Sequence, residues 1–327
     1  MPSESTKNSK SPPAPEGQEE INSQQDQKSR CIAAYLGLAI GDALGATVEF
    51  MTANEIKHEY GEHNEIIGGG WLRLQPGHVT DDTSMSLAMG KTIIENQRIN
   101  PYDIAHSFSM WLKSKPIDIG NTVRRGIQHF RVTNDPCSPE SEYAAGNGAC
   151  MRCLPVAIAT LAMGRSYVLR ANLHQSHVTH TNKLSDAGTQ CVIDMIQMAL
   201  RGEDLSSLLA GPVVDLINIQ PEFDFHKNEI TNPSGYIVDT LQAVFQALSE
   251  TSSFEECLVN VVNRGGDADT SGAIAGMIAG SLYGLSGIPK RWLESLDPEI
   301  ADECEFQAGR LYDLRNDIHI SDSNPLI

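Results

Sequence analysis

The sequence predicts an all-α fold, a single compact helical domain, and three observations favour it. Along residues 237–248 apolar side chains recur mostly three and four residues apart, which places them on one face of a helix. Alternating apolar and polar runs are scarce, and no strand alternates with a helix as a parallel sheet requires. Residues typical of helix starts recur: Pro101 follows Asn100, and Ser253 and Glu256 have capping-box spacing.

The other helices are predicted from the same spacing, taken in order along the chain. The first begins near Cys31, and Ser185 precedes another apolar-periodic segment. Residues 61–77 are rich in glycine and are predicted to form a loop or hairpin. Further helices are expected over residues 84–95, 102–113, 237–248, 257–262, 271–283 and 304–316.

Two of these helices are rich in small residues. Gly37, Gly41 and Gly45 lie four apart in the first, and glycine and alanine crowd one side of residues 272–280. An interior glycine costs a helix roughly 1 kcal/mol relative to alanine, and close helix packing in a core would offset that cost. The same spacing occurs in membrane dimers, but acidic residues accompany both segments. We therefore expect close packing in the core.

The charge balance excludes several classes of protein. With 24 basic and 42 acidic side chains the 327 residues carry a net charge of −18, unlike a nucleic-acid or anionic-membrane binder. No apolar run has the length of a bilayer span, and the N-terminus lacks the apolar core of a signal peptide. The seven scattered cysteines do not resemble a secreted disulfide framework. We expect a cytoplasmic protein with no transmembrane segment and no nucleic-acid partner.

The first 28 residues differ in composition from the rest. They contain four prolines, many Ser, Gln and Glu residues, and few apolar side chains. Such a segment buries too little apolar surface to offset its ordering entropy. The predicted organisation is therefore a disordered polar tail over residues 1–28 and one domain over residues 29–327.

Two short acidic segments precede predicted helices, Thr80-Asp81-Asp82-Thr83 and Gly266-Asp267-Ala268-Asp269-Thr270. Taken singly, each is better explained as a helix cap. Four carboxylates gathered in one place would instead take up protons or bind divalent cations. Oxygen donors without a nearby His or Cys pair suit Mg²⁺ or Mn²⁺ and disfavour Zn²⁺. Two such segments together favour a two-metal site.

Four motifs in this order and spacing resemble the ADP-ribosylglycohydrolase family over about residues 29–300. They are Gly41-Asp42-Ala43-Leu44-Gly45, Thr80-Asp81-Asp82-Thr83, Gly146-Asn147-Gly148-Ala149 with Met151-Arg152, and Gly266-Asp267-Ala268-Asp269-Thr270. Further stretches resemble the branch that acts on nitrogenase: residues 45–52, 68–74, 111–126, 236–240 and 265–270.

The resemblance implies an all-α hydrolase with two Mn²⁺ (or Mg²⁺) ions. Its substrate would be dinitrogenase reductase, the nitrogenase iron protein, carrying ADP-ribose on an arginine, and hydrolysis would reactivate nitrogenase. Docking to a PII signalling protein is a further expectation for this branch. By matched position the metal ligands would be Thr80, Asp81, Asp82, Asp267, Asp269 and Thr270.

The resemblance also implies the catalytic and substrate-binding residues. Asp118 would be the catalytic acid/base, because a guanidine leaves poorly unless it is protonated, and Glu49 would lie beside the metals. Direct attack by water and prior opening of the ribose ring both fit these residues. Residues that would line the ADP-ribose cleft are Asn121, Gly146, Asn147, Gly148, His180 and Tyr236.

Some features leave alternatives open. Residues 181–183 lack the second His and the Pro of the nitrogenase-linked branch, so they receive no role. Cys150 and Cys153 have redox or zinc-knuckle spacing, but buried small side chains explain them better. The same fold and metals would serve a hydrolase of ADP-ribosylserine or O-acetyl-ADP-ribose. A non-catalytic ADP-ribose binder is the third hypothesis, and the intact aspartates argue against it.

Overall fold

The computed structural model describes residues 16–322, with side chains from residue 23 onward, and its fold is all-α, as predicted. The strands in that part of the chain are two short parallel ones, β1 (Arg98–Ile99) and β2 (His319–Ile320). The α-helices are α1 (Glu16–Gly45), α2 (Ala53–Tyr60), α3 (Asp81–Asn96), α4 (Pro101–Lys113), α5 (Asn121–Thr133), α6 (Leu154–Ala159), α7 (Arg165–Ser176), α8 (Lys183–Leu200), α9 (Leu205–Leu208), α10 (Val214–Ile219), α11 (Ile237–Glu250), α12 (Phe254–Val262), α13 (Ala268–Tyr283), α14 (Lys290–Ser295) and α15 (Pro298–Leu314). Single turns are η1 (Glu142–Ala144), η2 (Leu209–Val213), η3 (Pro221–Phe223) and η4 (Leu285–Gly287).

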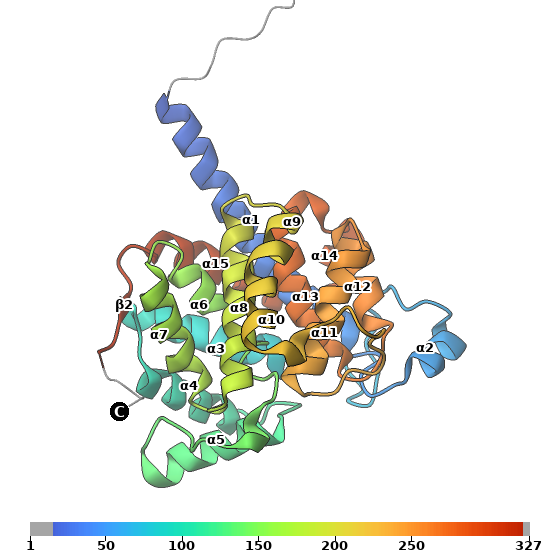
Figure 1. The fold of residues 1–327 in the computed structure, drawn as a ribbon, viewed down its shortest axis with the longest axis horizontal. Helices are drawn as coiled ribbons and strands as arrows, with labels where there is room; N and C mark the ends of the chain where they lie inside the picture. The colour runs from blue at the N-terminus through green and yellow to red at the C-terminus, as the bar shows by residue number, and fades with distance from the viewer. Residues whose placement is uncertain (1–15, 323–327) are drawn as a thin grey trace, which may run out of the picture.

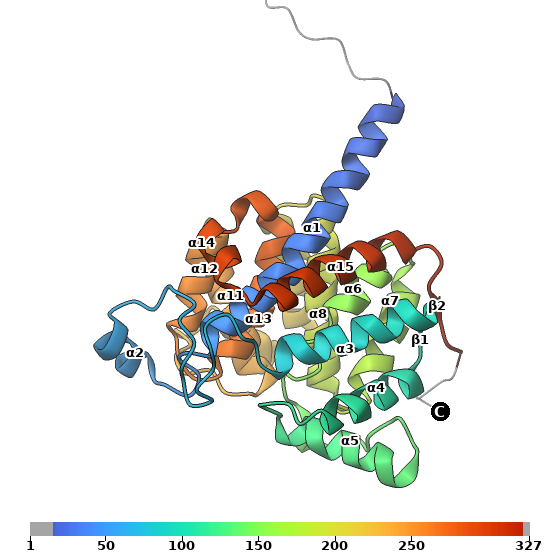
Figure 2. The same cartoon turned by 180° about the vertical axis from the view of Figure 1, so that it is seen from behind.

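Helix α1 enters the centre of the molecule, while its N-terminal part projects from the body (Figure 1). Its buried part lies along α13, and α8, α11 and α12 pack around α13. From behind, α15 crosses next to α1, and α3 and α4 follow below it (Figure 2). This arrangement brings the first turns of α3 and α13 together, with Thr270 Oγ1 3.5 Å from Asp82 Oδ2.

The small residues of α1 and α13 face one another, as expected. A Cβ added to Gly41 would lie 2.0 Å from the carbonyl oxygen of Gly272, and one added to Gly276 would lie 2.0 Å from that of Gly37. The two backbones are therefore in direct contact within the core. No helix in the described part of the chain is long and apolar enough to cross a membrane.

A methyl group at Gly276 is expected to destabilise the fold. The group it would meet is backbone of α1, which can yield only if the two helices separate. Overpacking of this kind typically costs about 1–3 kcal/mol, so Gly276→Ala should lower the free energy of unfolding by about 2 kcal/mol in urea titrations. Gly164→Ala is the matched control, because a Cβ there has no neighbour within 4 Å. Equal unfolding midpoints for the two variants would contradict the close packing.

The predicted boundary between tail and domain does not match a helix end. Helix α1 begins at Glu16, so the helix includes the second part of the segment predicted to be a disordered tail. Lys28 Nζ lies 2.8 Å from Asp313 Oδ2, and Gln27 donates to Leu200 O at 3.2 Å. Glutamine, glutamate and lysine favour helices, and a helix extends readily from a buried nucleus. Residues 1–15, the first part of that segment, lie outside the described residues.

Several helices start earlier than expected, α3 at Asp81, α12 at Phe254 and α13 at Ala268, and two others are capped by a side chain other than the expected one. Helix α8 is capped by Asn182 rather than started at Ser185. Helix α15 begins at Pro298 after the cap Asp297, well before the expected start at residue 304. Ser253 caps α12 as predicted, but the Glu256 side chain accepts from Ser252 N, so the capping box is incomplete.

Candidate active site

A cavity of about 350 Å³ lies where the starts of α3, α5 and α13 meet the segment after α1. Most of the residues with predicted roles line it: Glu49, Asp81, Asp118, Asn121, Gly146, Asn147, Gly148, His180, Asp267, Asp269 and Thr270. Residues from six separate segments thus meet in one cavity. The sequence alone does not show that these segments lie close together.

Three predicted residues do not line this cavity. Thr80 and Asp82 are buried, and Thr80 Oγ1 donates to Asp82 Oδ2 at 3.0 Å. Tyr236 is 39% exposed and immediately precedes α11, where its backbone forms a bridge with Gly146. Its neighbour Gly235 lines the cavity instead.

Carboxylates gather at the helix starts in this cavity. One carboxylate oxygen from each of Glu49, Asp267 and Asp269 lies within 4.8 Å of the others. Asp81 and Asp82 occupy the first turn of α3, where positive helix dipole ends favour acidic groups. The first turns of α3 and α13 thus place the two acidic segments against each other.

Burial raises the pKa values of these groups. The pKa of Glu49 rises to about 8 and that of Asp81 to about 7, with neighbouring carboxylates adding to the effect of burial. Burial also raises the pKa of Asp267, and it raises those of Asp82 and Asp269 well above their usual range. Such a cluster favours bound protons or bound cations.

The donor set fits a hard divalent cation. Asp82 Oδ1 is fully buried, and no hydrogen-bond partner in the described structure reaches it. A buried carboxylate oxygen without a partner is costly, and a metal ion would remove that cost. Since the converging donors are carboxylate and hydroxyl oxygens, they suit Mg²⁺ or Mn²⁺.

Without bound cations, the protein is expected to lose stability as the pH rises from about 4 to 8. Unfolded carboxyl groups titrate near pH 4, whereas those of Asp42, Asp81 and Glu49 have folded pKa values of about 6, 7 and 8. The folded state therefore binds more protons in this window, and the free energy of unfolding falls with rising pH. Melting temperatures of chelator-treated protein should decrease across this range. A rise would contradict the buried cluster.

Asp42 holds the start of α3 from within α1. Its carboxylate accepts from the backbone N–H groups of Thr80 (2.9 Å) and Thr83 (3.0 Å) and from the Thr83 hydroxyl (2.6 Å). Burial raises its pKa to about 6. The acidic first turn of α3 is thereby anchored to the central helix.

The loop 146–148 closes another side of the cavity. Asn147 Nδ2 donates to Asp267 Oδ2 (2.6 Å) and to Thr240 Oγ1 (3.0 Å). The ring of His180 lies against this loop, because a Cβ at Gly148 would come 2.8 Å from its Cε1. Backbone N–H groups in such glycine-containing loops suit anionic groups.

A buried chain of hydrogen bonds orients His180. Arg152, fully buried, donates from Nη2 to Thr179 Oγ1 (2.8 Å), which lies 2.7 Å from His180 Nδ1. A guanidinium only donates, so the Thr179 oxygen accepts from it, and the hydroxyl hydrogen has Nδ1 as its acceptor. This arrangement favours the tautomer that carries the ring hydrogen on Nε2, on the side of the 146–148 loop. Burial, together with nearby arginine charges, holds the pKa of His180 well below its usual range, so the ring is neutral.

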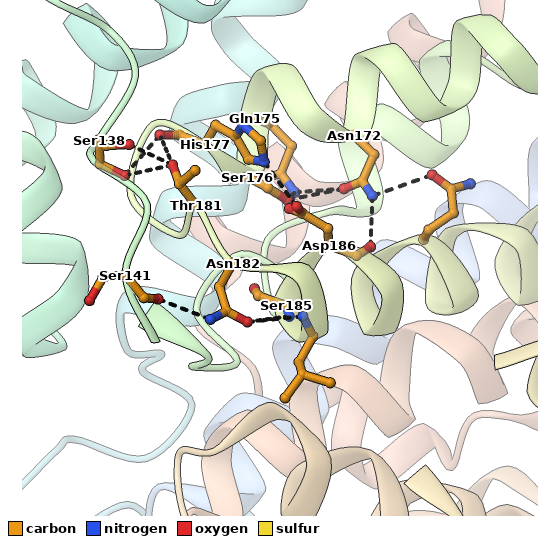
Figure 3. A network of polar contacts seen from close by, with 12 residues as sticks. Ser138, Ser141, Asn172, Gln175, Ser176, His177, Thr181, Asn182, Ser185 and Asp186 are labelled. Carbon is orange, nitrogen blue, oxygen red and sulfur yellow. Dashed lines mark hydrogen bonds and ion pairs between the residues drawn. The ribbon is translucent and has the colours of Figure 1, made fainter. Parts of the chain in front are cut away.

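A second polar network fixes the loop between α7 and α8 that carries His180 (Figure 3). His177 Nε2 lies 2.9 Å from Asp186 Oδ2, and Ser138 Oγ donates to the His177 carbonyl at 3.0 Å. Thr181 Oγ1 donates to the Ser138 carbonyl at 2.7 Å. Residues 177–181 are therefore tied to α8 and to the segment after α5.

The model of the ADP-ribosylglycohydrolase family matches residues 23–319. The chain belongs to the ADP-ribosylglycohydrolase family. This confirms the family resemblance read from the four motifs.

Several relatives in this family match most of the chain. It is 45% identical over 283 residues to the ADP-ribosyl-[dinitrogen reductase] glycohydrolase of Rhodospirillum rubrum, covering 86% of this chain and 95% of that protein. It is 32% identical to the ADP-ribosylarginine hydrolase Tri1 of Pseudomonas putida (strain GB-1), covering 82% and 74%. A solved structure titled "ADP-ribosylglycohydrolase-related protein complex" matches with a TM-score of 0.79 and 33% identity, over 89% of this chain and 99% of that one.

Some residues of this ADP-ribosylglycohydrolase site were not assigned from sequence. Asp42 and Arg152 belong to two of the four family motifs, but the sequence by itself assigns no role to either residue. A charged residue within an apolar helical segment was the available signal for Asp42. Nothing in the sequence pointed to Thr179, since its role depends on a side chain from another segment.

Proposed function

We propose that this chain is a hydrolase dependent on two Mn²⁺ or Mg²⁺ ions that removes ADP-ribose from an arginine of dinitrogenase reductase. The carboxylates of Glu49, Asp267 and Asp269, which line one cavity with Asp118, and the buried, partnerless Asp82 Oδ1 carry the proposal. The 45% identical relative, ADP-ribosyl-[dinitrogen reductase] glycohydrolase of Rhodospirillum rubrum, supports this substrate.

The metal ligands in this proposal are those with matched positions. They are Thr80, Asp81, Asp82, Asp267, Asp269 and Thr270. The position of Glu49 beside Asp267 and Asp269 adds it as a further candidate ligand. When bound, the ions would hold the ribose hydroxyls and orient the sugar.

The carboxylates would also serve the chemical step. Cleavage of an N-glycosidic bond passes through an oxocarbenium-like state, which nearby anionic oxygens stabilise. Asp118, partly exposed on the cavity wall, would give a proton to the departing guanidine nitrogen. Glu49 accepts a hydrogen bond from Trp71 Nε1 at 2.6 Å, which fixes its orientation.

The cavity offers donors for the diphosphate of ADP-ribose. His180 presents Nε2–H next to the 146–148 loop. The Asn147 N–H of that loop donates to Gly235 O at 3.0 Å, so Gly146 and Gly148 would supply the further N–H groups. Asn121, at the first position of α5, lines the same cavity. Tyr236 would stack on the adenine from the partly exposed position before α11.

The direct test compares linkages. We expect release of ADP-ribose from ADP-ribosylated dinitrogenase reductase in the presence of Mn²⁺, together with recovery of nitrogenase activity. An ADP-ribosylserine peptide and O-acetyl-ADP-ribose, at the same concentration, should be cleaved far more slowly. Faster cleavage of either would favour the alternative hydrolases, and binding without any cleavage would favour a non-catalytic ADP-ribose binder.

Thr179→Val is expected to weaken binding of ADP-ribose. Valine keeps the shape of threonine but removes the hydroxyl between Arg152 and His180, so the ring no longer favours Nε2–H. One lost hydrogen bond to an anionic ligand corresponds to about 1.5–3 kcal/mol, roughly a 10- to 100-fold increase in Kd by calorimetry. Thr179→Ser should retain wild-type affinity. Equal affinities for Thr179→Val and the wild type would contradict the relay.

The proposal includes a cytoplasmic location and docking to a PII signalling protein. All seven cysteines are free, which supports a reducing, cytoplasmic compartment. Docking to a PII signalling protein rests on the resemblance alone.

A further inference from the structure

Two exposed aromatic side chains line the cavity, and the faces of their rings are open to a ligand. Phe50 directly follows Glu49 and is 65% exposed, and Trp71 is 52% exposed. Their ring centroids lie 5.4 Å apart. Exposed rings of this size bury little apolar surface in the protein itself, so the folded core does not explain them.

Phe50 adopts a backbone conformation that bulky residues rarely adopt. Its φ is +63°, and its N–H donates at 2.7 Å to the carbonyl oxygen of Gly266, the first residue of the second acidic segment. A left-handed phenylalanine is an outlier, and such strain persists where the surrounding structure enforces it, often at functional sites. The strain aims an exposed ring at the cavity instead of into the core.

Contacts of the glycine-rich loop 61–77 hold Trp71 in a fixed position. Gly69 and Leu74 form an antiparallel bridge, and Gly70 lies so close to the segment after α1 that a Cβ would come 2.3 Å from Ala46 O. The Trp71 indole then donates to Glu49 Oε2 at 2.6 Å. The ring is therefore fixed beside the cluster's carboxylates.

We propose that Phe50 and Trp71 form the subsite for the arginine side chain of the modified protein, an inference that rests on the proposed function. The faces of aromatic rings attract a planar guanidinium, and the carboxylates of Glu49 and Asp118 line the same cavity. An anionic diphosphate is not attracted to the face of an aromatic ring, and the donors of His180 and the 146–148 loop are available for it instead. The aromatic pair thus selects a cationic leaving group over a neutral one such as serine.

The test distinguishes binding of the arginine leaving group from binding of ADP-ribose. Phe50→Leu removes the first ring, whose side chain makes no hydrogen bond. Trp71→Leu removes the second ring, whereas Trp71→Phe keeps an aromatic ring at that position. KM and kcat are measured on an ADP-ribosylated arginine peptide, and the Kd of free ADP-ribose is measured by calorimetry. Phe306→Leu, a 56% exposed ring on α15 that does not line the cavity, is the matched control.

We expect Phe50→Leu and Trp71→Leu to raise KM for the peptide by about 3- to 30-fold, the range of one cation–π contact. The Kd of ADP-ribose should not change, and Trp71→Phe should recover most of the loss. A parallel rise in the Kd of ADP-ribose would overturn the proposal by assigning the rings to that ligand, and an unchanged KM in both leucine variants would overturn it as well. If the wild type does not cleave the arginine linkage, the proposed function fails and this inference fails with it.

Discussion

Removal of divalent cations is expected to abolish hydrolysis by this ADP-ribosylglycohydrolase and to lower its melting temperature at neutral pH. Asp81, Asp82, Asp269 and Glu49 are buried together beside the half-buried Asp267, and desolvation raises the pKa of each. Without cations these groups repel one another or hold protons. A ligand at a hundredfold excess over its Kd stabilises the folded state by about 2.7 kcal/mol. Mn²⁺ should restore activity and stability better than Zn²⁺.

Single substitutions test whether the dependence on divalent cations arises from the carboxylate cluster. Asp269→Ala and Asp82→Ala should lose metal and activity together, measured by elemental analysis and by release of ADP-ribose. Asp194→Asn is the matched control, because Asp194 is also largely buried with a raised pKa but lies on α8 away from the cavity. Full turnover by metal-free protein would rule out the two-metal hypothesis.

Asp118→Asn is expected to reduce turnover by roughly 10²- to 10⁴-fold, the usual contribution of a general acid or base. Asparagine keeps the shape of the side chain but cannot give up a proton to the guanidine. Asp118 lines the cavity but is not part of the carboxylate group formed by Glu49, Asp267 and Asp269. Metal content and the Kd of ADP-ribose should therefore stay near the wild-type values.

The outcome of this experiment assigns the acid. Near wild-type turnover on ADP-ribosylated dinitrogenase reductase would show that Asp118 is not the proton donor. If the variant loses bound metal as well as turnover, Asp118 is a metal ligand. In that case Glu49 becomes the candidate acid, because burial raises its pKa to about 8.

The sequence by itself determined the fold class, the family and the residue types of the site. Helical spacing is a local property, so α4 and α11 were predicted to within one or two residues. The glycine stripe of α1 predicted close packing, because only such packing offsets the cost of glycine in a helix. The acidic segments were assigned to helix starts for the same local reason.

Only the tertiary structure decided how these parts meet. Asp82 and Thr270 are 188 residues apart in sequence, and their contact depends on how α3 and α13 pack on α1. The orientation of His180 depends on Arg152 through Thr179, and the aromatic pair depends on a loop packed against the segment after α1. Burial, and with it every raised carboxylate pKa, is a property of the assembled core, since desolvation requires neighbours that are distant in the chain.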